Sequence, residues 1–77
     1  MKERIKQILA SVFGIDPSDI NDDSSPENIE EWDSLKHMNM ILALEEEFQI
    51  RFTNEEVIEL ISCALIESMI KEKLAET

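Results

Sequence analysis

The first thirteen residues repeat apolar side chains at helical spacing. Five of them follow the i, i+3, i+4, i+7, i+8 pattern of one helical face: Ile5, Ile8, Leu9, Val12 and Phe13. Gly14 comes next, at a position where helices commonly end in a left-handed residue. The pattern predicts an amphipathic helix from about Lys2 to Phe13.

From residue 15 to residue 33 the helical pattern gives way to Asp, Asn, Ser and Pro. These side chains hydrogen-bond to their own backbone and favour turns over helix. We expect a long ordered loop, anchored by Ile15, Ile20 and Ile29. Residues 25–28, Ser-Pro-Glu-Asn, predict one short turn within it, because proline is favoured at the first helical position after a serine cap.

The helical pattern returns after Asp33, which is a suitable N-cap for a second helix from about Ser34 to Glu47. Residues 53–56, Thr-Asn-Glu-Glu, form a capping-box pattern that starts a third helical segment. Its apolar pattern continues as far as Leu74 without Gly or Pro. The spacing alone does not separate one long helix from two helices divided near Ser62, Cys63 and Ala64.

Composition narrows the functional classes. A chain of 77 residues forms one domain, and 18 acidic against 7 basic residues give a formal charge of -11. This charge repels phosphate backbones and anionic lipids, so we expect no nucleic acid and no membrane as partner, but a protein with a basic patch. No secretion signal or apolar span stands in the sequence, and Cys63 has no second cysteine to pair with. We therefore expect a cytoplasmic monomer, with Cys63 as a small buried residue.

The segment Trp32-Asp33-Ser34-Leu35, followed by Met38, Met40 and residues 43–48, Ala-Leu-Glu-Glu-Glu-Phe, resembles the phosphopantetheine-binding acyl carrier family. The resemblance extends over the whole chain. It implies a free-standing carrier domain over residues 1–77, built as an all-α, four-helix up-and-down bundle. It also implies a long loop between helices I and II and a short helix III, with the break near Ser62.

The resemblance implies that Ser34 bears a covalent 4'-phosphopantetheine, which a phosphopantetheinyl transferase takes from coenzyme A. The carrier is then not an enzyme, and it holds acyl groups as thioesters for acyl-loading and acyl-using enzymes. Local physics agrees, since a helix N-terminus favours an attached phosphodiester. Asp33 supplies the cap and, by analogy with the family, helps the transferase and its metal ion to dock, while Leu35 gives an apolar anchor.

Partner enzymes are expected to dock along helix II and the start of helix III. The predicted contacts are apolar Leu35 and Met40, ringed by Glu45, Glu46 and Glu55. These carboxylates are otherwise a solvated face.

Four residues depart from the family's pattern in ways that bear on partner choice. Glu31 stands where Gly is frequent, Trp32 is bulky beside the site, and Lys36 and Asn39 stand where acidic residues are common. The cargo stays open between fatty acyl, polyketide and aminoacyl groups, including specialised pathways. We expect His37 to be an exposed or rim residue of helix II, because no nucleophile or acid stands at a defined spacing from it.

The loop offers an alternative from another class. Asp19, Asn21, Asp23, Glu27 and Glu30 occupy positions 1, 3, 5, 9 and 12 of an EF-hand calcium loop. Against a calcium-binding interaction protein, position 6 holds serine where the sharp turn requires glycine, and no second loop stands in the chain to pair with the first.

Overall fold

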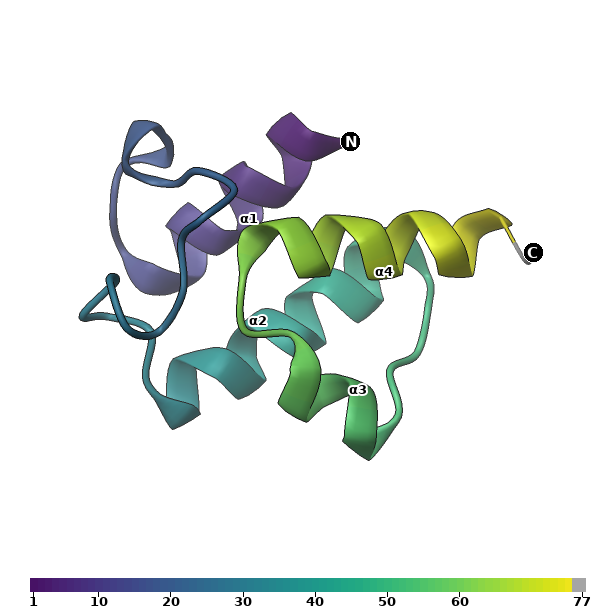
Figure 1. Cartoon of the computed structure of the whole chain (residues 1–77). Coiled ribbons are helices and arrows are strands. Elements are labelled where there is room, and N and C mark those ends of the chain that lie inside the picture. Colours follow the sequence, from purple (N-terminus) through teal and green to yellow (C-terminus); the bar gives the residue numbers. More distant parts are fainter. Residues whose placement is uncertain (76–77) are drawn as a thin grey trace.

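Four helices and one short 3-10 turn make up the fold of the computed structural model, which describes residues 1–75 (Figure 1). In chain order they are α1 (Lys2–Phe13), η1 (Pro17–Asp19), α2 (Ser34–Phe48), α3 (Asn54–Glu59) and α4 (Cys63–Ala75). The described residues contain no strand. The predicted all-α bundle, its long loop between the first two helices and its short third helix are confirmed. None of the described helices is long and apolar enough to cross a membrane.

The ends of α1 and α2 use left-handed residues. Gly14 has φ 73°, and its N–H donates to the Ala10 carbonyl at 2.8 Å, as the sequence predicts for the end of α1. Gln49 has φ 55° and ends α2, so this helix runs one residue beyond the predicted Glu47. The Gln49 side-chain amide also donates to the Glu46 carbonyl at 2.7 Å, which helps to hold this end.

The C-terminal half divides into α3 and α4, as the family resemblance implied. Thr53 and Glu56 form the predicted reciprocal capping box at the start of α3. The helix ends at Glu59, and the Ser62 hydroxyl accepts from the Leu65 N–H at 3.2 Å, so it caps α4.

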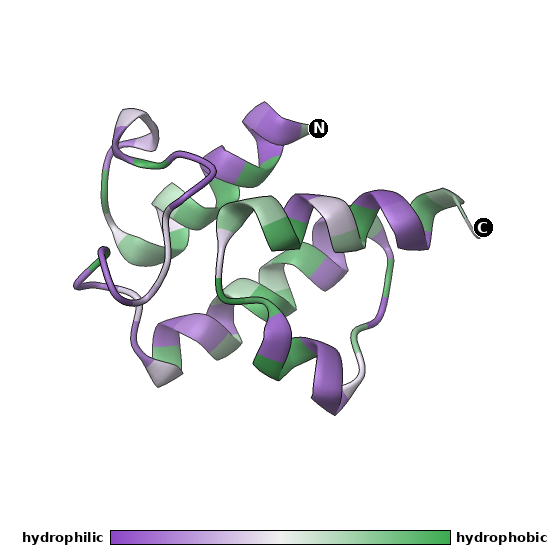
Figure 2. Ribbon diagram, viewed as in Figure 1, coloured by the Kyte–Doolittle hydropathy of each residue, from purple (hydrophilic) through white to green (hydrophobic). Residues whose placement is uncertain are grey.

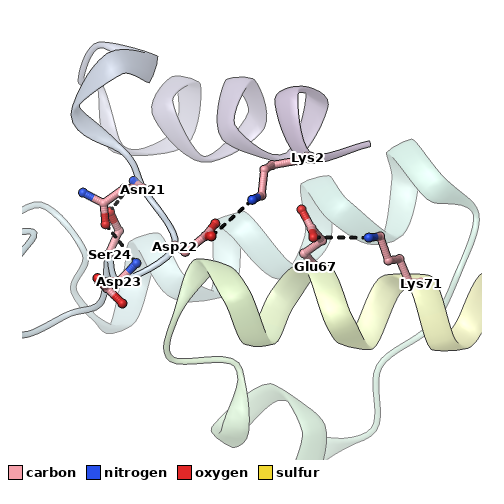
Figure 3. A network of polar contacts seen from close by, with 7 residues as sticks. All are labelled: Lys2, Asn21, Asp22, Asp23, Ser24, Glu67 and Lys71. Carbon is pink, nitrogen blue, oxygen red and sulfur yellow. Dashed lines mark hydrogen bonds and ion pairs between the residues drawn. The ribbon is translucent and has the colours of Figure 1, made fainter.

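The long loop is ordered by its own side chains (Figure 3). The Asn21 side chain accepts from the Asp23 N–H at 2.8 Å, and the buried Ser24 hydroxyl accepts from the Asn21 N–H at 2.9 Å. Lys2 forms an ion pair with Asp22 at 3.1 Å, which joins the loop to the start of α1. The Asn21 side-chain oxygen that a calcium loop would offer therefore holds the loop itself. The described residues contain no group of three or more His, Cys, Asp or Glu placed to bind a metal ion.

The loop also completes the N-terminus of α4. The N–H groups of Cys63 and Ala64 donate to the Ser24 and Asp22 carbonyls at 3.1 and 3.2 Å. These amides would otherwise lack partners, because the first turn of a helix has none within the helix. The residue 25–28 turn is present as predicted, since the Ser25 carbonyl accepts from the N–H groups of residues 28 and 29.

One apolar core lies between α1, α2 and α4, with α3 at its side. Figure 2 shows apolar positions on the faces that the helices turn toward one another. The loop contributes Ile20 and Ile29 to this core, and Cys63 is 1% exposed, as expected. The buried apolar residues are Ile5, Ile8, Leu9, Ala10, Phe13, Ile20, Ile29, Trp32, Met40, Ile41, Leu44, Ile50, Leu60, Cys63, Ile66 and Ile70.

Candidate functional site

Ser34 is the first residue of α2 and is exposed. The preceding Asp33 is extended, and its carboxylate accepts from the Lys36 N–H at 2.8 Å, so it caps the helix as predicted. The first turn of α2 carries no acidic residue. The Asp33 carboxylate takes one amide of this turn, and the positive end of the helix dipole still favours an anionic group at the serine.

A groove of about 500 Å³ begins at Ser34; we call it the Ser34 groove. Its walls come from the loop, from the first turn of α2 and from the end of α3, and two of its apolar residues, Ile58 and Ile61, are 74% and 52% exposed. A volume of this size is typical of a small-molecule site. The lining residues are Pro26, Trp32, Asp33, Ser34, His37, Met38, Ile58 and Ile61.

A chain of two hydrogen bonds lies beneath this groove. The Trp32 indole Nε1–H donates to His37 Nδ1 at 3.0 Å, and His37 Nε2 lies 2.7 Å from the Val57 carbonyl of α3. A carbonyl only accepts, so Nε2 carries the proton and Nδ1 is left to accept from the indole. His37 is therefore a half-buried link between α2 and α3 that also lines the groove, which fits the predicted rim position rather than the exposed one.

Trp32 itself belongs to the core. It is 3% exposed, and its ring centroid lies 5.0 Å from that of Phe13 in a tilted arrangement. The imidazole of His37 lies nearly parallel to the indole, with ring centroids 6.2 Å apart. The residue two before the candidate serine thus joins the loop, α1 and α2.

The predicted apolar docking contacts separate into one exposed and one buried residue. Leu35 is 69% exposed beside Ser34. Met40 is 0% exposed, so its prediction as a docking contact is wrong: together with Ile41 and Leu44 it forms the side of α2 that faces the core. The exposed apolar residues of this region are instead Leu35, Met38, Leu42, Ile58, Ile61 and Leu65.

The three carboxylates predicted to ring the docking contacts differ in exposure. Glu46 and Glu55 are exposed, whereas Glu45 is partly buried and its carboxylate accepts from the Phe52 N–H at 2.8 Å. Glu45 therefore holds the segment between α2 and α3.

The two residues that replace acidic residues of the family also differ from each other. Lys36 Nζ donates to the Val12 carbonyl at 3.3 Å, near the C-terminus of α1, whereas Asn39 is exposed.

The other titratable groups near the bundle's ends have structural roles. Burial raises the pKa of the Cys63 thiol, which keeps it protonated and poorly nucleophilic. The hydrogen bond from Lys73, at 2.8 Å, together with the Thr53 backbone N–H, lowers the pKa of Glu56. Glu56 thereby joins the start of α3 to the last turns of α4.

Comparison with known proteins agrees with this arrangement. The family described as phosphopantetheine attachment site matches residues 3–70. An acyl carrier protein of Clostridium acetobutylicum is 36% identical over 74 residues, which is 96% of each chain. The solution structure of a holo acyl carrier protein from Geobacter metallireducens superposes with a TM-score of 0.87 at 31% identity, over 97% of this chain and 86% of that chain.

Proposed function

The chain belongs to the phosphopantetheine attachment site family, whose members are carriers rather than catalysts, and we propose that Ser34 is the residue that bears the arm. The observation that carries this assignment is the exposed Ser34 hydroxyl at the N-terminus of a capped helix, at the edge of an apolar groove. Asp33 presents the serine by capping the helix that it starts.

The residues present fit a covalently attached phosphopantetheine. The N-terminus of α2, whose first turn carries no acidic residue, favours the phosphodiester, and the Ser34 groove offers apolar surface to the chain that follows it. When attached, the arm supplies a terminal thiol that holds an acyl group as a thioester. The protein's own residues orient the serine and keep the site open to solvent.

We further propose that residues 1–77 act as one carrier domain, monomeric and cytoplasmic, whose partners are a phosphopantetheinyl transferase and acyl-loading and acyl-using enzymes. These enzymes dock on exposed apolar residues beside Ser34, chiefly Leu35 and Met38, through surfaces with basic patches that meet Glu46 and Glu55. The formal charge of -11 supports this, because complementary charge speeds encounter and sets partner choice. Fatty acid and polyketide biosynthesis are the candidate settings.

Incubation with coenzyme A and a broad-specificity phosphopantetheinyl transferase tests the assignment. We expect the intact mass to rise by one arm in the wild type, and by none in Ser34→Ala. Ser11→Ala is the matched control, since Ser11 is an exposed helical serine remote from the groove, and it should be modified like the wild type. Modification of Ser34→Ala would overturn the assignment.

A further inference from the structure

The Ser34 groove ends against a closed wall. Trp32 is its innermost lining residue in terms of burial, at 3% exposed, and its ring rests on Phe13 in the core. The core side chains of α2 and α4 include four that are 0% exposed: Met40, Leu44, Ile66 and Ile70. Trp32 is the one lining residue of the groove that also belongs to the buried core, so we infer that an apolar chain entering the core from this groove has to displace it.

Trp32 is held by directional bonds as well as by contact. The neutral His37 ring has one donor and one acceptor, and both are used: one for the indole N–H and one for the Val57 carbonyl. Moving Trp32 away from His37 leaves a largely buried N–H donor without its partner, which is unfavourable. Moving α3 away from α2 breaks the second bond in the same way.

We propose that Trp32, His37 and the Val57 carbonyl form a latch that keeps acyl cargo in the surface groove and out of the core. His37 is the positioning residue of the latch. The latch selects the cargo, because the carrier holds short acyl groups in the groove and offers long apolar chains no buried site. This inference rests on the proposed attachment at Ser34. The groove's apolar walls accommodate a short chain, and the closed wall denies the extra burial that would favour a long one.

The test compares the wild type loaded with acetyl, butyryl, octanoyl or dodecanoyl phosphopantetheine from the corresponding acyl-coenzyme A. The two readouts are the melting temperature and the Trp32 indole N–H resonance, which is unambiguous because the chain has one tryptophan. We expect both to be independent of chain length. A melting temperature that rises with chain length, together with a moving indole resonance, would overturn the latch.

Variants of His37 separate the latch from mere packing. His37→Ala removes both hydrogen bonds and leaves space beside Trp32, so octanoyl and dodecanoyl loading should raise its melting temperature by about 5 °C over acetyl loading. His37→Gln retains one acceptor and one donor and should restore the wild-type independence of chain length. Asn39→Ala, at an exposed position on the same helix, is the matched control and should behave like the wild type.

A second variant covers the case in which His37→Ala does not fold. Trp32→Phe keeps an aromatic ring in the core but deletes the indole donor and leaves a smaller side chain, so its melting temperature should also become sensitive to chain length. Equal insensitivity in folded His37→Ala and Trp32→Phe would overturn the latch. Failure of any acyl group to load onto the wild type would instead contradict the attachment at Ser34, so the two failures are distinguishable.

Discussion

Two grooves of similar volume flank α2, and only one of them has the features of a carrier site. The Arg4 groove, about 530 Å³ between α1 and the C-terminal half of α2, is crossed by the Arg4 to Glu47 ion pair at 2.8 Å. The Ser34 groove, about 500 Å³, combines apolar walls with an exposed hydroxyl at a helix N-terminus. Volume therefore does not identify the site, whereas a reactive hydroxyl beside apolar surface does.

The two grooves also differ in how their walls are held. In the Ser34 groove the wall is held by the buried Trp32 and the two hydrogen bonds of His37, and removing them disturbs the packing of the core. In the Arg4 groove an exposed ion pair bridges two helices that already pack through buried residues. Exposed pairs contribute little to stability, so substitutions in the two grooves should have very different effects.

The largest effect is expected at Trp32. Trp32→Ala deletes a buried aromatic ring and its bond to His37, and should lower the free energy of unfolding by about 3 to 5 kcal/mol. Urea unfolding followed by circular dichroism measures this change. Leu42→Ala is the matched control, because Leu42 is 60% exposed and should change stability little. A change of similar size in the two variants would mean that Trp32 does not close the core.

The next effect concerns partner recognition at Leu35. Leu35→Ala removes an exposed apolar contact beside Ser34 and should lower kcat/KM for acyl transfer by a partner enzyme about tenfold, the loss typical of an interface contact worth 1 to 2 kcal/mol. The melting temperature should be unchanged. Gln7→Ala, in the Arg4 groove, should leave transfer unaffected. Equal losses in both variants would remove the functional distinction between the grooves.

A smaller effect is expected at Glu56, and it depends on pH. Glu56→Gln keeps an acceptor for the capping box but removes the ion pair with Lys73, so stability at neutral pH should fall by up to about 1 kcal/mol. The pKa of Glu56 is lowered in the folded state, so its stabilisation is present above the ordinary value of 4.5 and is lost as the pH falls through the folded-state pKa.

Urea unfolding of both proteins over that range measures the pH dependence, and the two curves should converge under acid conditions. Glu55→Gln, at the exposed neighbouring position, is the control, and its unfolding should match that of the wild type at every pH. A difference between wild type and Glu56→Gln that persists at acid pH would show that the cap, rather than the charge, was altered.

The smallest effect is expected in the Arg4 groove. Arg4→Ala breaks an exposed ion pair and should leave both modification of Ser34 and acyl transfer at wild-type rates, with a slight loss of thermal stability that disappears at high salt. Differential scanning fluorimetry at low and high salt, with loading assays on the same samples, checks this. Impaired loading would show that the Arg4 groove takes part in function.

Local patterns determined much of what could be predicted from the sequence. The helix ends follow from residues with a direct local effect, such as Gly14 after α1 and Asp33 before α2, and the capping box at Thr53 follows in the same way. The candidate attachment serine, Ser34, was indicated by the resemblance of its segment to the carrier family, with which its helix start, its loop and the acidic composition agree. These features depend on neighbours in the chain and need no knowledge of tertiary packing.

The rotation of α2 could not be predicted in this way. Apolar residues cover a broad arc of this helix, so periodicity does not decide whether Met38 or Met40 faces the core. Packing against α1 and α4 decides it, with Met40 buried and Met38 exposed. The bond of His37 to the Val57 carbonyl likewise joins residues twenty positions apart, and no local pattern signals it.

The mass of the protein from its native source tests the central claim most directly. Intact mass spectrometry, followed by fragmentation of the peptide that contains Asp33, Ser34 and Leu35, should show one phosphopantetheine on Ser34 and, in part of the population, an acyl group of short chain length. An unmodified Ser34 in cells that contain an active phosphopantetheinyl transferase, or the arm on another residue, would contradict the assignment of Ser34 as the carrier site.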